Sequence, residues 1–179
     1  MVQPADPRLP PRPIHHIAYV VDDIPAAAWM WCKTFGAGPF LTVVRTAGEP
    51  PEQDHDGAPA RFRPVVAFGQ WGAIAVELLR VEAAEPATLA AHFTAPFNHV
   101  AYVSPTPLED SDRLAALGLP RFLHSRRGDV ETLWHAIPQL GHAVEIHRAT
   151  PQLEAFFGAV AAAAEGWDGS EPLREYHQR

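Results

Sequence analysis

The chain has 179 residues, of which 47% are hydrophobic and 20% charged, proportions that permit one globular domain or two small modules around a common core. Its formal net charge of -7, from 14 basic and 21 acidic residues, argues against a nucleic-acid-binding protein and favours a small-molecule partner. The single cysteine, Cys32, excludes an internal disulfide and a thiolate metal cage. Because there is no signal-peptide pattern and no apolar run of membrane-spanning length, we expect a cytoplasmic protein that does not bind membranes.

The first part of the chain predicts a short arm and one strand-helix-strand-strand-strand module. Residues 1–13 contain five prolines and no hydrophobic periodicity, which is typical of an extended arm. Asp23 and Pro25 are suited to begin a helix, and Gly36 is suited to end it. The expected elements of this module, residues 14–81, are strands at 14–21, 39–45, 62–68 and 73–81, a helix at 24–35, and a polar loop at 46–59.

The rest of the chain predicts a linker, a second module of the same order and a final helix. Residues 82–96 are rich in alanine and glutamate and are interpreted as the linker. The second module, residues 97–148, is expected to have strands at 97–103, 121–125, 130–137 and 142–148 and a helix at 108–117. Residues 149–179 are expected to form a helix that begins after Thr150 and Pro151, followed by a polar tail.

Two phrases of the sequence occur twice. His16 on an apolar strand recurs as His99, and the Ile-Ala-Tyr-Val that follows it recurs as Val-Ala-Tyr-Val. Glu77 recurs as Glu145, each preceded by Ala-Val on a later apolar strand. The histidines are 83 residues apart and the glutamates 68, and the difference is about the length of the loop at 46–59. The sequence therefore predicts a duplicated unit with one inserted loop.

The repeated residues also predict a metal site. Two imidazoles and two carboxylates suit a divalent first-row ion such as zinc, nickel, cobalt, manganese or iron, and they leave room for water or substrate. A glutamate between apolar neighbours is unusual unless it is paired or ligated. Taken singly, each residue has a simpler explanation, a hydrogen-bonded core histidine or a solvent-facing glutamate. Because matching positions recur in two copies, we expect His16, Glu77, His99 and Glu145 to meet around one metal ion.

The same strands resemble a known family. The phrases at residues 16–24, 35–40, 76–78 and 144–146 resemble the vicinal oxygen chelate superfamily, which includes glyoxalase I, methylmalonyl-CoA epimerase, extradiol dioxygenases and bleomycin-resistance proteins. The similarity covers residues 14–148 and is strongest to the epimerase-like branch. It implies an α+β fold in which two tandem βαβββ modules form a curved, cup-shaped mixed β-sheet with flanking helices, and it implies the same four ligands inside the cup. We also expect a homodimer; whether the modules of one chain close the cup or swap with a second chain stays open.

The ligand set favours proton-transfer chemistry within that superfamily. The resemblance implies a metal-dependent isomerase, epimerase or lyase that moves a proton next to a metal-bound carbonyl or enolate. No separate base matches, since Glu49 and Glu52 fall in the long loop, so Glu145 or Glu77 is expected to be the catalytic carboxylate. Two alternatives remain: an Fe(II)-dependent extradiol-type dioxygenase, and a non-catalytic small-molecule binding or resistance protein that uses the same cup.

Five further residues are expected to contact the substrate. His147 shares a strand face with Glu145, and either Trp134 or His135 on the neighbouring strand must face inward. Gln70 and Trp71 lie in a predicted turn near the mouth of the cup. The full set is His147, Trp134, His135, Gln70 and Trp71.

Two other sets of polar residues are expected to have structural and not functional roles. His15 is expected to point away from His16, because successive side chains on a strand face opposite sides. His124, Arg126 and Arg127 form a small basic cluster that suits a substrate carboxylate or phosphate, but a solvated loop is the simpler interpretation.

Overall fold

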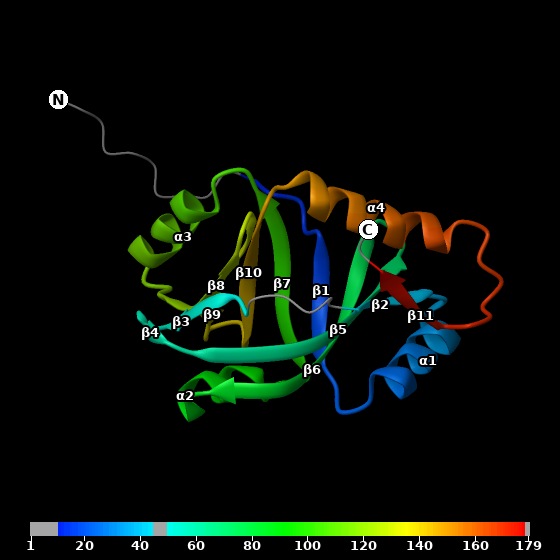
Figure 1. Ribbon diagram of the computed structural model, residues 1–179, viewed down its shortest axis with the longest axis horizontal. Helices are drawn as coiled ribbons and strands as arrows, with labels where there is room; N and C mark the ends of the chain where they lie inside the picture. Colours follow the sequence, from blue (N-terminus) through cyan, green and yellow to red (C-terminus); the bar gives the residue numbers. More distant parts are fainter. Residues whose placement is uncertain (1–10, 45–49, 178–179) are drawn as a thin grey trace.

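A computed structural model describes residues 11–44 and 50–177 of the chain. Within these ranges the chain forms eleven strands in one curved, unclosed mixed sheet, together with four α-helices (Figure 1). The α+β architecture expected from the sequence is confirmed. The expectations for residues 1–10 and for 45–49, which include Glu49, lie outside the described residues.

Each half of the chain follows the same order of elements. The first half comprises β1 (His16–Val20), α1 (Ile24–Phe35), β2 (Phe40–Val44), β5 (Arg61–Trp71) and β6 (Ile74–Glu85). The second comprises β7 (Phe97–Ser104), α3 (Pro107–Ala116), β8 (Arg121–Arg127), β9 (Val130–Ile137) and β10 (His142–Arg148). The helix α2 (Ala87–Ala90) and a 3-10 turn (Ala91–Phe93) connect the two halves. The predicted strands and helices of both modules are therefore present, with boundaries shifted by a few residues.

The order of strands in the sheet places the two modules side by side in one chain. That order is β11-β2-β5-β6-β1-β7-β10-β9-β8-β3-β4, so equivalent strands lie at equal distances from the central β1–β7 pair. The central pair is antiparallel, with His16 opposite Ala101 and Ala18 opposite His99. Parallel strands flank it on both sides, β6 next to β1 and β10 next to β7. In this single chain, the two modules therefore form one continuous sheet.

The first helix illustrates how local sequence sets these boundaries. The Asp23 side chain accepts a hydrogen bond from the backbone N–H of Ala26 at 2.9 Å, and Pro25 occupies the first turn. Gly36 ends the helix with a φ of 66°, a conformation that favours glycine. The helix buries Ile24, Ala28 and Trp31 against the face of the sheet opposite the cup, where Tyr19 also packs.

Three short strands extend the edges of the sheet where no strand was expected. Part of the predicted loop at 46–59 forms β3 (Glu52–His55) and β4 (Ala58–Pro59), and β3 pairs with β8 of the other module. The Gln53 side chain holds β3 in place, since it donates to the carbonyl of Phe62 at 2.9 Å and accepts from the Phe62 N–H at 2.8 Å. The polar tail likewise forms β11 (Leu173–His177), which pairs in parallel with β2.

The last helix covers one side of the cup. The helix α4 (Pro151–Ala164) begins at Thr150, whose hydroxyl accepts from the Leu153 N–H at 3.1 Å. Its buried residues Phe156 and Val160 pack against Leu41 and Phe68 of the first module. In Figure 1 the helix runs along the top of the view, above β5. None of the helices in the described part of the chain is long and apolar enough to span a membrane.

Candidate metal centre

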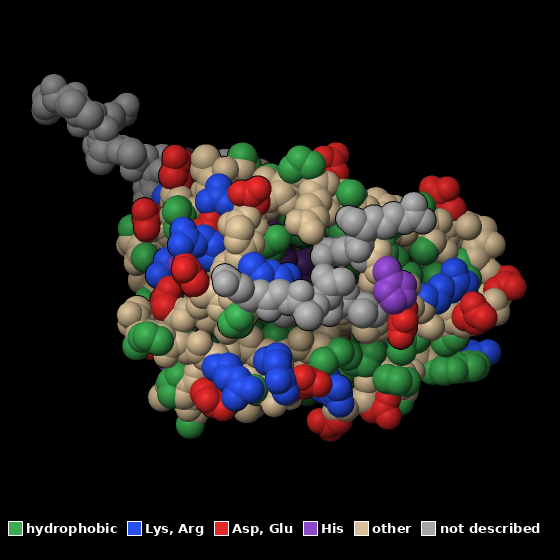
Figure 2. All heavy atoms as spheres, viewed as in Figure 1, with side chains coloured by type: hydrophobic (Ala, Val, Ile, Leu, Met, Phe, Trp, Pro, Cys, Tyr) green, Lys and Arg blue, Asp and Glu red, His purple; other side chains and the backbone are tan. Residues whose placement is uncertain are grey.

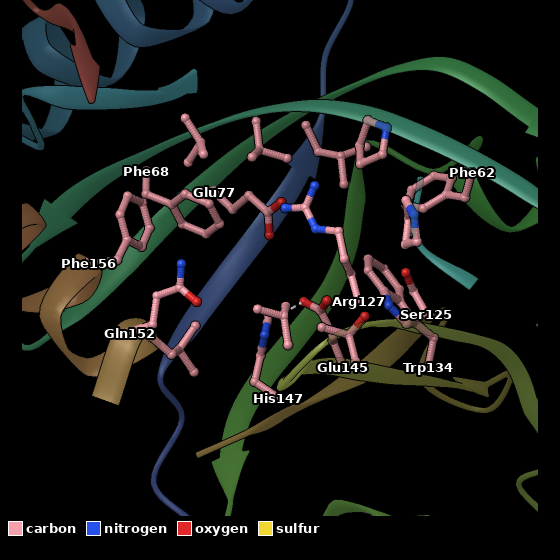
Figure 3. Close-up of a pocket in the computed structure, with 18 of the residues that line it drawn as sticks. Phe62, Phe68, Glu77, Ser125, Arg127, Trp134, Glu145, His147, Gln152 and Phe156 are labelled. Atoms are coloured by element: carbon pink, nitrogen blue, oxygen red, sulfur yellow. Dashed lines mark ion pairs between the residues drawn. The ribbon is translucent and has the colours of Figure 1, made fainter. Parts of the chain in front are cut away.

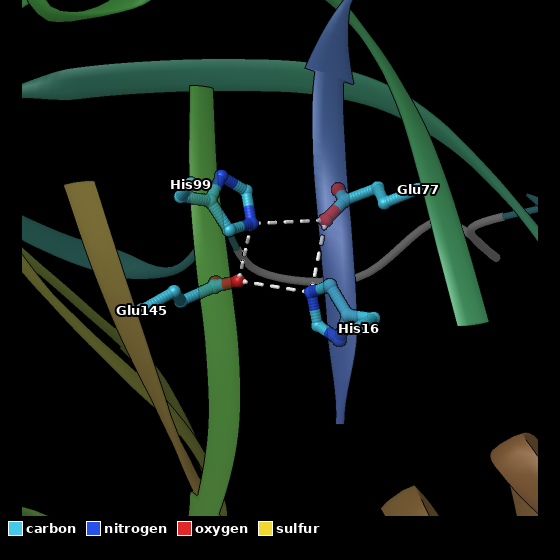
Figure 4. Close-up of side chains that lie close together, drawn as sticks. All are labelled: His16, Glu77, His99 and Glu145. Carbon is cyan, nitrogen blue, oxygen red and sulfur yellow. Dashed lines mark ion pairs between the residues drawn. The ribbon is translucent and has the colours of Figure 1, made fainter. Parts of the chain in front are cut away.

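The four repeated residues lie together at the centre of the sheet. Each comes from a different strand, β1, β6, β7 or β10, and their side chains converge (Figure 4). One potential ligand atom from each residue lies within 4.8 Å of the other three: the set is His16, Glu77, His99 and Glu145. The register explains the convergence, because Glu77 lies opposite Ala18 in β1 and Glu145 lies opposite Ala101 in β7, two residues beyond each histidine.

Each imidazole lies between the two carboxylates. His16 Nε2 is 3.2 Å from Glu77 Oε2 and 3.5 Å from Glu145 Oε2. His99 Nε2 is 3.3 Å and 3.1 Å from the same two atoms. Both histidines have no exposed surface and both glutamates are 4% exposed, so the cluster is shielded from bulk water.

The contacts favour a metal site over a network of hydrogen bonds. Although carboxylate oxygens surround them, the Nε2 atoms of His16 and His99 have no hydrogen-bond partner with suitable geometry among the described residues. A buried polar atom without a partner is costly, whereas a lone pair directed at a shared cation is satisfied. Imidazole nitrogen and carboxylate oxygen also suit borderline divalent ions. The residues therefore fit a divalent metal ion.

The charge state of the metal-free cluster follows from the same contacts. Burial alone would lower the pKa of His99, but Glu145 and Glu77 raise it to about 9. The pKa of His16 is raised by the same two carboxylates against the same effect of burial. Burial would raise the pKa of both glutamates. The two imidazoles nevertheless hold the pKa of Glu77 below its usual value. His147 and the same two imidazoles hold the pKa of Glu145 well below its usual value. Both carboxylates are therefore ionised and available as ligands.

The residue before each ligand histidine contacts its ring. His15 was expected to point away from His16, but it precedes β1, and its Nδ1 lies 3.2 Å from His16 Nδ1. In the second module, His99 Nδ1 lies 3.1 Å from Asn98 Oδ1. Asn98 is held in turn by its amide, which donates to the His92 carbonyl at 2.9 Å. Burial, followed by the proximity of His16, lowers the pKa of His15 to about 4, so a neutral His15 ring accepts the Nδ1–H of His16. In both modules the preceding residue thus leaves Nε2 as the free ligand atom.

A cavity of about 220 Å³ opens onto the cluster. Glu77 and Glu145 lie in its wall, and most of the remaining lining is apolar or aromatic (Figure 3). The space-filling view shows a hollow near the centre of this face, with a basic side chain at its edge (Figure 2). The largest apolar contributors are Phe62, Phe68, Trp134, Phe156 and Phe157. The phenylalanines of α4 were not anticipated from the sequence, although two adjacent aromatic residues on an alanine-rich helix were a possible signal.

Two of the five residues expected to contact substrate line this cavity. Trp134 does so from β9, with its ring 4.5 Å from that of His99. His147 does so from β10, and its Nε2 lies 2.9 Å from Glu145 Oε2. Both positions agree with the alternation of side chains on strands, because Trp134 is directly opposite Glu145 in the sheet.

The other three residues lie elsewhere, which corrects the sequence-based assignment. His135 faces α3 on the opposite side of the sheet, where its ring nitrogens lie 2.8 Å from Ser111 Oγ and 2.6 Å from the Leu119 carbonyl. Gln70 donates to the Gly72 carbonyl at 2.8 Å and borders a separate cavity. The Trp71 ring packs against Trp31 and Phe35 of α1. These contacts are made away from the candidate metal centre.

The described residues supply no further carboxylate to the cavity. Glu52 is exposed and pairs with Arg126 at 2.7 Å, outside the lining. Glu77, Glu145 and His147 are the only acidic or histidine side chains among the residues that line it. These three are therefore the acidic and histidine side chains that the described part of the chain presents to the cavity.

Comparison with solved structures shows the same fold. A hypothetical protein, BH1468 from Bacillus halodurans C-125, has a TM-score of 0.54 and 15% identity over 79% of this chain and 96% of its own. Methylmalonyl-CoA epimerase from Mycobacterium tuberculosis has a TM-score of 0.51 and 15% identity over 79% of this chain and 91% of its own. A methylmalonyl-CoA epimerase of Streptomyces coelicolor, in complex with 2-nitronate-propionyl-CoA, has a TM-score of 0.50 and 17% identity over 78% of this chain and 95% of its own. At these identities the similarity shows the fold alone.

Comparison of sequences identifies the family. No curated protein sequence gives a significant match. Residues 15–132, most of the chain, match the sequence profile described as the Glyoxalase/Bleomycin resistance protein/Dioxygenase superfamily. The chain belongs to this superfamily, as its repeated strand phrases predicted.

Proposed function

We propose that the protein is a metal-dependent isomerase, epimerase or lyase that transfers a proton next to a carbonyl or enolate oxygen of a small molecule. The observation that carries this proposal is the set of four convergent ligand atoms in the wall of an otherwise apolar cavity. Membership of a superfamily that includes enzymes supports it. The two carboxylates distinguish the proposed chemistry, because a 2-His-1-carboxylate set with open positions is typical of ferrous oxygenases.

Each residue of the cluster has a defined part in this proposal. His16, His99, Glu77 and Glu145 would hold a divalent zinc, nickel, cobalt, manganese or iron ion, oriented by His15 and Asn98. When bound, such an ion supplies Lewis-acid polarisation of a substrate oxygen. Glu145 or Glu77 would accept the proton at a carboxylate oxygen, since both line the cavity.

The two candidate proton acceptors differ in their contacts. Glu145 Oε2 has His147 Nε2 at 2.9 Å in addition to the two imidazoles, and these groups hold its pKa well below the usual value against the effect of burial, which weakens it as a base. Among the described residues Glu77 contacts the two imidazoles alone, so both carboxylates stay candidates. The aromatic walls of the cavity would exclude bulk water and thereby strengthen the electrostatic interactions within it.

Metal analysis of the purified protein tests the site, and exchange with solvent deuterium tests the chemistry. We expect about one equivalent of divalent metal per chain, and deuterium incorporation next to the carbonyl of a 2-oxo or acyl-CoA compound, followed by NMR. Combining His16→Ala with Glu145→Gln should remove both. Combining His124→Ala with Glu131→Gln alters a histidine–glutamate pair at 2.9 Å that lies away from the cluster, and should remove neither. Full metal content in the first double variant would refute the assignment.

A further inference from the structure

One basic side chain enters the cavity beside the candidate metal centre. Arg127 is the last residue of β8 and lines the cavity together with Ser125 of the same strand. Figure 3 shows its side chain extending into the cavity, on the side where Ser125 and Trp134 lie. Arg126, between them, points the other way and pairs with exposed Glu52 at 2.7 Å. Both arginines are exposed, but the alternation of the strand directs Arg127 to the cavity and Arg126 away from it.

Arg127 differs from the neighbouring arginines in its contacts. Arg148 is engaged by Glu131, and Arg121 lies 3.5 Å from Asp54. Arg127 makes no ion pair or hydrogen bond with any residue in the described ranges. The other lining residues include no lysine or arginine. Within the described ranges, the lining of the cavity thus includes one guanidinium whose donors meet no protein acceptor.

The charge of the metal centre makes this guanidinium significant. The ligand set contains two carboxylate side chains, Glu77 and Glu145, which as ligands would match the two positive charges of a divalent ion. A loaded cluster with two neutral imidazoles therefore carries no net charge and gives an anion little overall attraction. Among the lining residues, Arg127 is then the permanent positive charge that a negatively charged group of the substrate would meet.

We infer that the substrate is a small carbonyl compound with an apolar body and one carboxylate, which Arg127 binds while other oxygens of the molecule meet the metal centre. This inference rests on the proposed function. A cavity of about 220 Å³ is only moderately larger than the roughly 150 Å³ cavity that admits benzene, so the part of the substrate that lies inside it is small. One planar guanidinium matches one carboxylate in a bidentate pair, and the lining has no further lysine or arginine for a second anionic group. Arg127, which was expected in a solvated loop, is the last residue of β8 and is exposed at the edge of the cavity.

A matched pair of metal-binding probes tests the inference. Benzohydroxamate offers two oxygens to a metal, and 4-carboxybenzohydroxamate adds one carboxylate to the same body. Their dissociation constants would be measured by calorimetry on zinc-loaded wild-type protein and on the Arg127→Gln and Arg126→Gln variants. We expect the wild type to bind the carboxylated probe about tenfold more tightly, as a charge-assisted hydrogen bond predicts. Arg127→Gln should abolish that preference and leave the affinity for benzohydroxamate unchanged, whereas Arg126→Gln should retain the preference.

The outcomes separate this inference from the proposed function. If wild-type protein binds benzohydroxamate but shows no preference for the carboxylated probe, the inference is wrong and the metal site stands. A preference that survives in Arg127→Gln, or that disappears equally in Arg126→Gln, also overturns it. If zinc-loaded protein cannot be prepared, or binds neither probe, the proposed function fails and the inference fails with it.

Discussion

His15 offers a direct test of how the ligand histidines are held. Its Nδ1 lies 3.2 Å from His16 Nδ1, at the position that Asn98 occupies beside His99 in the second module. Replacing His15 by leucine removes the hydrogen-bond acceptor while keeping a side chain of moderate size against Phe157. Replacing it by asparagine installs the residue that the second module uses. We expect the leucine variant to lose metal affinity and the asparagine variant to retain most of it.

The expected loss can be bounded from the contact that is removed. A partner that orients a ligand histidine typically changes metal affinity by about 10- to 100-fold, which corresponds to about 1.4–2.7 kcal/mol. The effect on the fold should be smaller. His15 is half-buried and its ring packs edge-on against Phe157 at 4.0 Å, so losing one hydrogen bond lowers the free energy of unfolding by about 1 kcal/mol.

Zinc affinity would be measured by competition with a chromophoric chelator, and ligand geometry by the visible absorption of the cobalt-loaded protein. His142→Leu serves as the control, because His142 is also half-buried but contacts the Ala143 carbonyl instead of a ligand nitrogen. Unchanged affinity in His15→Leu would refute the orienting role. Equal losses in His15→Asn and His15→Leu would show that the two modules do not hold their histidines in the same way.

Three further predictions concern the fold. Gly69→Ala should lower the free energy of unfolding by about 1–3 kcal/mol in urea titrations, because an added Cβ would lie 2.9 Å from the Phe40 ring; an unchanged midpoint would show that the ring moves freely. Gly158→Ala should raise it by about 0.5–1 kcal/mol, since this position in α4 has open space and alanine favours helix; a loss would contradict this. Burial lowers the pKa of His135 relative to the unfolded chain, so the free energy of unfolding should fall as the pH drops below about 6.5, by at most about 1.4 kcal/mol per pH unit. His135→Gln should flatten this pH dependence. Parallel pH profiles for the wild type and the variant would contradict the prediction.

The elements of the two modules and the grouping of four residues could be predicted because the information is local and occurs twice. Apolar strands, helix caps and glycine stops are short patterns, and each recurs at an equivalent place in the second module. His16 and Glu77 taken alone have ordinary explanations. Their recurrence as His99 and Glu145 removes most of the ambiguity, since two copies of one unit tend to pack about a shared axis.

The walls of the cavity could not be predicted in the same way because they depend on register and on unrepeated segments. Whether Trp134 or His135 faces inward is decided by which of them lies opposite Glu145 in β10, and no local pattern sets that register. The strand β5 continues through Trp71, into the turn predicted at residues 69–72, and Trp71 packs against α1. The pairing of β3 with β8 joins residues about 70 positions apart and leaves no periodic signal in a four-residue strand.

The contrast between these two sets of residues suggests how the site divides its work. The four ligand candidates occupy symmetric positions, whereas Phe156 of α4 and Arg127 of β8 line different sides of the cavity (Figure 3). A symmetric cluster can bind an ion but cannot distinguish the two ends of a substrate. The apolar α4 side and the basic β8 side can do so. Substitutions in the cluster should therefore abolish metal binding and every activity that depends on it, while substitutions at Arg127 or Phe156 should change which molecules bind and leave metal content intact.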